Sequence, residues 1–173
     1  MRILVTTALF LLGLTPQTFG QQVGPKEYDI VVYGGTSGGI SAAVQAARMG
    51  KSVILIEPGK HLGGLTSGGL GATDIGNKKA IGGIAREFYQ RLRKHYEEDD
   101  AWKYEKRADF KGRGHEPKED TAWTFEPRVA AEVYRALLRE HKVPIVLGQR
   151  LDLAKGVRKE GTQIGRASCR ERV

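Results

Sequence analysis

The sequence predicts an α/β fold built around a parallel β-sheet. Three observations support this prediction. Residues 28–57 read as a strand, a glycine turn, a helix and a second strand, and residues 127–140 form an amphipathic helical pattern that is followed by an apolar strand at 143–147. Strands that alternate with helices in this way usually lie parallel in one sheet, because each helix carries the chain back to the same end.

The first strand and the turn after it have the composition of a phosphate-binding unit. Residues 29–33 are a continuous apolar run, which is typical of a strand buried in a parallel sheet. The turn from Gly34 to Gly39 follows, and its glycines permit a tight bend and close approach of backbone N–H groups to a phosphate. The helix expected at 40–49 directs its positive N-terminal end at the same place and ends at Gly50.

The second predicted strand, residues 52–56, delivers Glu57 to its C-terminal end, where an acid can accept hydrogen bonds from ribose hydroxyls. A strand, a glycine turn, a helix and then an acid form the context that a dinucleotide-binding motif requires. Thr36 departs from the GxGxxG pattern because it replaces the second glycine, although its hydroxyl can itself donate to a phosphate oxygen. The alternative is an ordinary βαβ unit whose turn binds nothing.

Residues 58–83 are too rich in glycine for regular structure and contain the small donors Thr66 and Ser67. Because this long loop directly follows Glu57, we expect it to be functional rather than a flexible surface loop. Residues 81–97 predict an amphipathic scaffold helix. The polar residues 99–121 read as a lid or a substrate-side insertion. Three basic side chains in this segment are candidates to hold an anionic substrate: Arg107, Lys111 and Arg113. Charges in a loop are more commonly just solvated.

The last part of the chain predicts a helix and then strands. Pro127 is well placed in the first turn of the helix over 127–140. After the strand at 143–147, residues 150–153 and 157–163 predict a β-hairpin with its turn at 159–161.

Composition limits the possible functions. The chain has 173 residues and a scattered net charge of +8, with no recognisable nucleic-acid-binding module, so we do not expect DNA or RNA binding. Cys169 is the single cysteine, which excludes a disulfide framework, a CxxC redox pair and a cysteine-rich metal site. His95 and His115 have no partner at metal-ligand spacing, so no metal is expected.

The first twenty residues predict a secretory signal peptide. Arg2 supplies a positive start, residues 3–14 form a short apolar run, and residues 18–20 offer a cleavage site before Gln21. An uncleaved anchor or a buried helix is the alternative. We therefore expect export to the periplasm or beyond, with no stable membrane span after cleavage.

The last ten residues, 164–173, resemble the translation of a short sequencing adapter and continue no earlier pattern. They are therefore set aside from the fold prediction. This division leaves a signal peptide at 1–20 and one domain at 21–163, which we expect to be the N-terminal part of a longer protein.

The βαβ unit, Glu57 and the stretch HLGGLTSGGLG together resemble the FAD-dependent oxidoreductases of the glutathione-reductase-like superfamily. The resemblance covers residues 28–163, and a GGTxxG version of the turn is familiar in that group. It implies a Rossmann-like FAD-binding domain with a parallel sheet that is incomplete at its C-terminus. An NAD-only Rossmann enzyme would explain the first unit but not the LGG stretch, so FAD is the expected cofactor.

In such enzymes FAD lies extended, and the resemblance implies a binding role for three groups of residues. The first turn would hold the pyrophosphate, the acid the adenosine ribose, and the LGG stretch the pyrophosphate and flavin side. The implied cofactor-binding residues are Gly34, Gly35, Thr36, Ser37, Gly38, Gly39, Glu57, Gly63, Gly64, Thr66, Ser67 and Gly68.

The resemblance implies hydride transfer between a small-molecule substrate and the flavin, in an exported enzyme of which this chain carries the FAD-binding part. No residue can be assigned as the general base, and His61 is interpreted as a loop histidine. Two alternatives remain open. One is a non-redox nucleotide-binding enzyme on the same fold, and the other is a truncated domain without activity.

Overall fold

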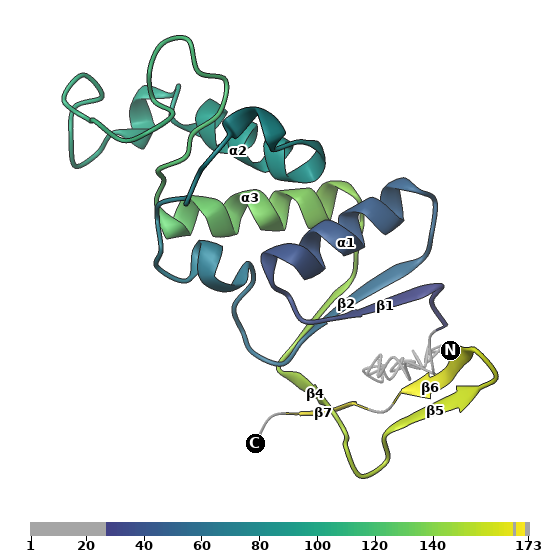
Figure 1. Cartoon of the computed structure of the whole chain (residues 1–173). Helices are drawn as coiled ribbons and strands as arrows, with labels where there is room; N and C mark the ends of the chain where they lie inside the picture. Colours follow the sequence, from purple (N-terminus) through teal and green to yellow (C-terminus); the bar gives the residue numbers. More distant parts are fainter. Residues whose placement is uncertain (1–26, 168, 172–173) are drawn as a thin grey trace, which may run out of the picture.

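A computed structural model of the chain describes residues 27–167 and 169–171, so the predicted signal peptide lies outside the described residues (Figure 1). The elements of the main body are β1 (Ile30–Tyr33), α1 (Ser37–Arg48), β2 (Val53–Glu57), η1 (Gly64–Ser67), η2 (Lys78–Ala80), α2 (Gly83–His95), η3 (Asp99–Ala101), α3 (Pro127–Glu140) and β3 (Ile145–Leu147).

The three strands of the main body form one parallel sheet in the order β1-β2-β3. Ile30 lies opposite Val53, and Leu55 lies opposite Ile145. All three strands therefore have their carboxyl ends at the same edge of the sheet, which confirms the predicted α/β fold with a parallel sheet.

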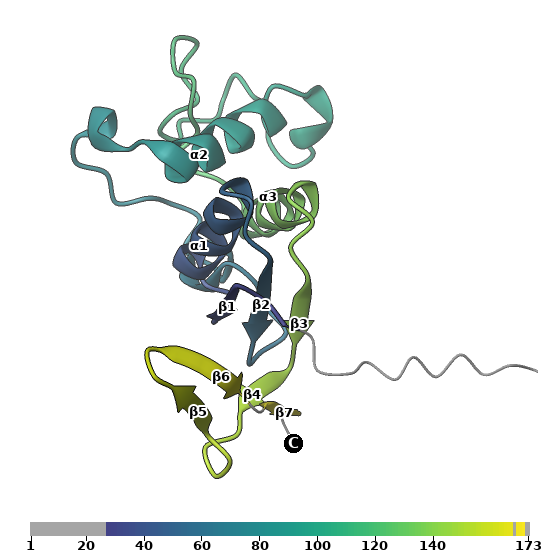
Figure 2. The same cartoon turned by 90° about the vertical axis from the view of Figure 1, so that its right-hand side faces the viewer.

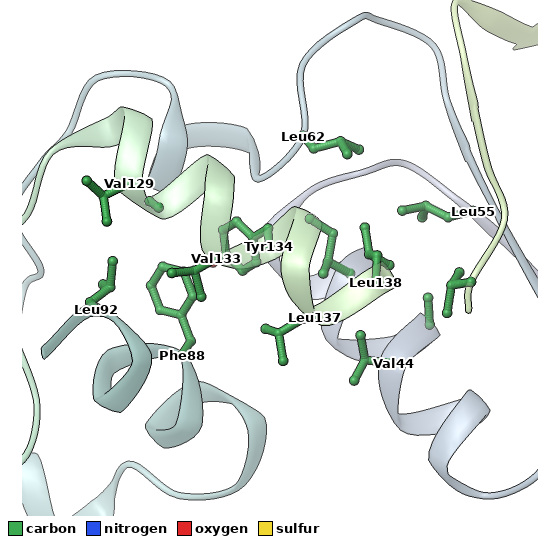
Figure 3. Packing of buried hydrophobic residues seen from close by; sticks show 14 of the residues in the cluster. Val44, Leu55, Leu62, Phe88, Leu92, Val129, Val133, Tyr134, Leu137 and Leu138 are labelled. Atoms are coloured by element: carbon green, nitrogen blue, oxygen red, sulfur yellow. The ribbon is translucent and has the colours of Figure 1, made fainter. Parts of the chain in front are cut away.

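Helices α1 and α3 lie against one face of the sheet, and α2 packs on the side of α3 away from the strands (Figures 1 and 2). The central position of α3 explains why its apolar side chains face two ways. Val129 and Val133 lie toward Leu92 and Phe88 of α2, whereas Leu138 lies toward the sheet (Figure 3). Each buried side chain of this size contributes about 1.5–3 kcal/mol through removal from water.

Strand β1 lies in the predicted place but is more exposed than its apolar sequence suggested. Ile30 is 37% exposed, and Val31 and Tyr33 are each 50% exposed. Within the described residues, β1 pairs with a neighbour along one edge only, and the helices cover one face of the sheet. The prediction of burial on both faces is therefore wrong for this part of the chain.

The strands after β3 pair differently from the prediction. The strand β5 (Val157–Glu160) pairs antiparallel with β6 (Gln163–Ala167), and β4 (Gln149–Leu151) pairs with β7 (Cys169–Glu171). A hairpin does form close to the predicted turn, between β5 and β6 around Gly161. The predicted pairing of residues 150–153 with 157–163 is wrong, because β4 pairs with β7 and β5 pairs with β6, and both partners lie wholly or mostly in the stretch that was set aside. The backbone pairing does not test the origin of residues 164–173, which stays a prediction.

The segment between α2 and α3 is mostly irregular and folds against α2. His115 lies among the rings of Tyr96, Trp102 and Phe110, at centroid distances of 5.0, 5.7 and 4.8 Å. Burial lowers the pKa of His115, whose Nε2 lies 2.7 Å from the Thr124 carbonyl oxygen. The aromatic cluster therefore anchors this segment through a histidine that favours its neutral form.

Candidate cofactor site

Three segments that are far apart in the sequence meet at the carboxyl edge of the sheet. The Gly34 amide donates to the Ile56 carbonyl at 2.7 Å, and the Gly63 amide donates to the Gly35 carbonyl at 2.7 Å. The Gly148 amide donates to the carbonyl of Gly59 at 2.8 Å. This edge is where ligands bind in open α/β folds, because the loops that leave the strands form a crevice there.

The Glu57 carboxylate lies at the centre of this meeting point. One oxygen accepts the Gly35 amide at 2.6 Å and the other accepts the Gly59 amide at 2.5 Å. A carboxylate has about four acceptor sites, so Glu57 keeps capacity for further donors. The acid therefore holds the glycine turn in place and can still accept hydrogen bonds from ribose hydroxyls.

The glycine turn closes tightly onto the first turn of α1. Gly34 has a φ of +109°, which favours glycine, and a Cβ added to Gly39 would lie 2.0 Å from the Gly34 carbonyl oxygen. Thr36 is the N-cap of α1, and its hydroxyl oxygen accepts the Gly39 amide at 3.2 Å. The departure from GxGxxG is thus a helix cap, and the Thr36 hydroxyl proton remains available to a phosphate.

The N-terminus of α1 has no acidic residue in its first turn. The first amide groups of a helix lack acceptors within the helix, and the helix dipole places partial positive charge there. Ser37 and Gly38 begin this turn. The arrangement therefore favours a phosphate group.

The second glycine segment packs against the first turn. A Cβ added to Gly64 would lie 3.5 Å from the Thr36 Cβ, and one added to Gly63 would lie 2.2 Å from the Ser67 Oγ. The buried Ser67 hydroxyl hydrogen-bonds the Leu62 carbonyl oxygen and lies 2.9 Å from the His61 Nε2. A hydroxyl has one proton to donate, so Ser67 stabilises its own loop in this structure.

Tyr134 of α3 is a residue that sequence analysis did not connect with the site. Burial raises the pKa of Tyr134, while hydrogen bonds with the Thr66 and Ser37 side chains act in the opposite direction. Its ring stacks on Phe88 at a centroid distance of 4.4 Å. Tyr134 lies within the amphipathic pattern of residues 127–140 and is buried. A buried tyrosine hydroxyl usually finds a polar partner, but only the packing shows which one.

Open space lies beside part of this framework. A Cβ added to Gly34 or to Gly69 would meet nothing within 4 Å, and one added to Gly38 would lie 3.9 Å from the Thr36 Oγ1. In contrast, a Cβ on Gly68 would lie 2.8 Å from the Gly64 carbonyl oxygen. Some glycines are therefore required by internal packing, whereas others leave room for a ligand.

The polar segment before α3 joins the glycine-rich stretch through a short antiparallel contact. The Phe125 amide donates to the Gly71 carbonyl at 2.7 Å, and the Thr73 amide donates to the Trp123 carbonyl at 2.9 Å. The Arg113 guanidinium donates to the Thr73 carbonyl at 2.9 Å. The other two basic candidates donate to carbonyl oxygens nearby in the sequence. Arg107 donates to the Glu97 carbonyl, and Lys111 donates to the Ala108 carbonyl.

A sequence model of the FAD dependent oxidoreductase family matches residues 29–172 of the chain. The chain belongs to this family. Its cofactor is FAD, as the LGG stretch after Glu57 predicted.

The similar proteins match only over parts of their length. The chain is 52% identical over 40 residues to a soluble pyridine nucleotide transhydrogenase of Mycobacterium tuberculosis, a match of 23% of this chain and 8% of that protein. It is 36% identical over 83 residues to an NADH:fumarate oxidoreductase of Klebsiella pneumoniae, covering 45% and 9% respectively. The chain thus spans less than a tenth of these two relatives.

A solved structure of L-amino acid deaminase from Proteus vulgaris shares the fold, with a TM-score of 0.54 and 17% identity over 84% of this chain and 50% of that chain.

The residues of this site fit FAD. The helix N-terminus suits a pyrophosphate, Glu57 retains acceptor capacity for a ribose, and open space lies beside Gly34. The individual binding roles of the twelve candidate residues stay predictions.

The described residues contain no group of three or more His, Cys, Asp or Glu side chains that could hold a metal ion.

Proposed function

We propose that this chain is the FAD-binding part of an exported oxidoreductase that exchanges hydride between a small-molecule substrate and the flavin. One observation carries the proposal: the Glu57 carboxylate binds the Gly35 and Gly59 amides beside the N-terminus of α1. The flavin ring supplies the hydride chemistry, while the protein binds and orients.

Each group at the site has one role in this proposal. The first turn of α1 and the Thr36 hydroxyl hold the pyrophosphate, and Glu57 accepts the ribose hydroxyls. The segment from Gly63 to Gly68 contacts the pyrophosphate and the flavin side of the cofactor. Tyr134 positions this segment, because its hydroxyl interacts with the Thr66 side chain of the glycine-rich stretch and with the Ser37 side chain at the start of α1.

Arg113 is our candidate for binding an anionic substrate. It donates to the Thr73 carbonyl, just beyond the segment proposed to lead to the flavin, and it forms no ion pair with any other described residue. The name of the Klebsiella relative, NADH:fumarate oxidoreductase, points to an organic acid and supports this assignment. A guanidinium suits a carboxylate because it can form two parallel hydrogen bonds.

Export rests on the predicted signal peptide alone. No helix in the described part of the chain is long and apolar enough to cross a membrane. Expression of the full-length gene with a C-terminal tag, followed by cell fractionation and N-terminal sequencing, tests this part of the proposal. We expect a mature N-terminus at Gln21, and tagged protein that stays in the cytoplasm would contradict export.

The main test is the flavin content of the purified full-length protein. We expect a flavin absorption spectrum, FAD released on denaturation, and bleaching under anaerobic conditions by one of a panel of reduced organic acids. Purified protein without flavin that still binds ADP would favour the non-redox alternative. Protein that binds neither FAD nor ADP would contradict both the oxidoreductase hypothesis and the non-redox enzyme hypothesis.

A further inference from the structure

His61 lies in the short loop that joins β2 to the second glycine segment. Both ends of this loop are held at the cofactor site. The Gly59 amide donates to the Glu57 carboxylate at 2.5 Å, and the Gly63 amide donates to the Gly35 carbonyl at 2.7 Å. The His61 side chain is exposed between these two anchors, so core packing does not account for its position.

The His61 ring makes one hydrogen bond within the described chain, and its partner is a buried serine. Ser67 is 5% exposed, and its Oγ lies 2.9 Å from the His61 Nε2. The same hydroxyl donates its proton to the Leu62 carbonyl oxygen. Because a hydroxyl has only one proton to donate, the Ser67 oxygen must accept from His61. The contact therefore requires a proton on Nε2 of the ring.

Ser67 in turn packs on the backbone of the second glycine segment. A Cβ added to Gly63 would lie 2.2 Å from the Ser67 Oγ and 2.7 Å from the Tyr134 Cδ2. Gly63 and Gly64 both have a positive φ, of +101° and +56°, which favours glycine. Leu62, whose carbonyl accepts the Ser67 proton, has its side chain in the core (Figure 3). The Ser67 hydroxyl thus ties this unusual backbone to the core.

The two hydrogen bonds of Ser67 together fix its orientation. A buried hydroxyl that both donates and accepts has less freedom to turn than one that only donates. His61 supplies the accepting contact and is the one partner of Ser67 whose side chain is exposed. Groups that hold a binding segment through such supporting hydrogen bonds improve the fit of the site to its ligand.

We propose that His61 is a positioning residue of the cofactor site. It acts through Ser67 to hold Gly63 and Gly64 in the backbone conformation that contacts FAD, and it does not itself touch the cofactor. This inference rests on the proposed function, because it assumes that the segment from Gly63 to Gly68 contacts FAD.

The experiment is a double-mutant cycle on FAD affinity, measured by fluorescence titration of the full-length apoprotein. We expect His61→Ala to raise the FAD dissociation constant about threefold to tenfold, the usual effect of one hydrogen bond. The double variant His61→Ala with Ser67→Ala should bind FAD as Ser67→Ala does alone, because His61 acts only through Ser67. His61→Gln should restore most of the affinity, since its amide nitrogen can donate to the Ser67 oxygen.

His141→Ala is the matched control. His141 is also a histidine with one side-chain hydrogen bond, from the Arg48 Nε at 3.1 Å, but it caps the C-terminus of α3 near the amino end of β3. We expect this variant to bind FAD normally. Nitrogen-15 NMR of the wild-type protein provides a readout that does not depend on the variants, and it should show the proton of the neutral His61 ring on Nε2.

Three results would overturn the inference. They are unchanged FAD affinity in His61→Ala, additive losses in the double variant, which would indicate direct contact of His61 with FAD, and a proton on Nδ1 of the neutral ring. A wild-type apoprotein that binds no FAD would contradict the proposed function and this inference with it. Normal FAD binding by the wild type together with unchanged affinity in His61→Ala would contradict the inference alone.

Discussion

Gly39 stands where the nucleotide turn becomes α1, and the absence of a side chain there allows the turn to close. Replacement by valine would place its Cβ 2.0 Å from the Gly34 carbonyl oxygen, so the turn must move. We expect Gly39→Val in the full-length protein to raise the FAD dissociation constant at least tenfold, or about 1.4 kcal/mol. Fluorescence titration of the apoprotein measures this change.

Gly76→Ala is the matched control for this variant. Gly76 lies in the glycine-rich stretch, has no positive φ, and has open space around an added Cβ. We expect its FAD affinity to be unchanged. Normal FAD affinity in Gly39→Val would show that the turn does not hold the cofactor.

Glu57 combines a structural contact with the proposed ribose contact, and two substitutions separate them. Glu57→Ala leaves the Gly35 and Gly59 amides without an acceptor, so we expect a loss of about 1–3 kcal/mol in unfolding free energy and low FAD occupancy. Glu57→Gln retains one acceptor oxygen and should lose less stability. Urea unfolding and flavin absorbance are the measurements, and full FAD occupancy in Glu57→Ala would contradict the assignment.

At the scale of the elements, a charge network joins the three helices. Glu87 of α2 contacts Arg48 of α1 and Arg91 of α2, both at 2.8 Å, and Arg91 contacts Glu140 of α3 at 2.6 Å. Burial raises the pKa of Glu87, but the hydrogen bonds from Arg48 and Arg91 outweigh it and lower the pKa overall. The Arg91 hydrogen bond likewise lowers the pKa of Glu140.

This network predicts a pH-dependent contribution to stability. Carboxyl groups with a lowered folded-state pKa stabilise the fold above the unfolded value of about 4.3, and this contribution disappears as pH falls through the folded-state pKa. Because these side chains are partly exposed, we expect Arg91→Gln to cost only about 0.5–1 kcal/mol at pH 7. The difference from wild type should shrink as pH falls below about 4.3.

Urea unfolding of the full-length protein at pH 7, 5 and 3 tests this prediction. Lys94→Gln, which removes a charge outside the network on the same helix, should show no such pH-dependent difference. An Arg91→Gln defect that is as large at pH 3 as at pH 7 would mean that packing, rather than charge, is responsible.

At the scale of the whole molecule, the described chain leaves β1 with an unpaired edge and an exposed apolar surface. Exposed strand edges and apolar patches promote association between copies. We therefore expect the 173-residue chain, produced alone, to self-associate, and Val31→Lys to reduce this association. Size-exclusion chromatography with light scattering measures the effect.

Tyr104→Lys is the control, because Tyr104 is 94% exposed but lies in the polar insertion away from β1. It should leave the association unchanged. A wild-type chain that is monomeric at all concentrations would show that the exposed face of β1 does not drive association.

The features that the sequence predicted correctly are those that depend on residues close together in the chain. Gly34 adopts a left-handed φ, Pro127 starts α3, and Glu57 is the last residue of β2. Each of these depends on backbone geometry or on a periodic pattern within a few residues. The fold class, the helices and the FAD assignment followed from such local features together with the family resemblance.

Tertiary structure decided the features that depend on distant partners. The Tyr134 hydroxyl reaches Thr66 and Ser37 because α3 lies beside the glycine turns, and no spacing in the sequence encodes that contact. The pairing of β4 with β7 was likewise missed. The sequence by itself determined which residues form the strand, turn and helix at the cofactor site. Only the tertiary structure decided which side chains support that turn and which strands pair, because these choices depend on long-range packing rather than on local backbone preference.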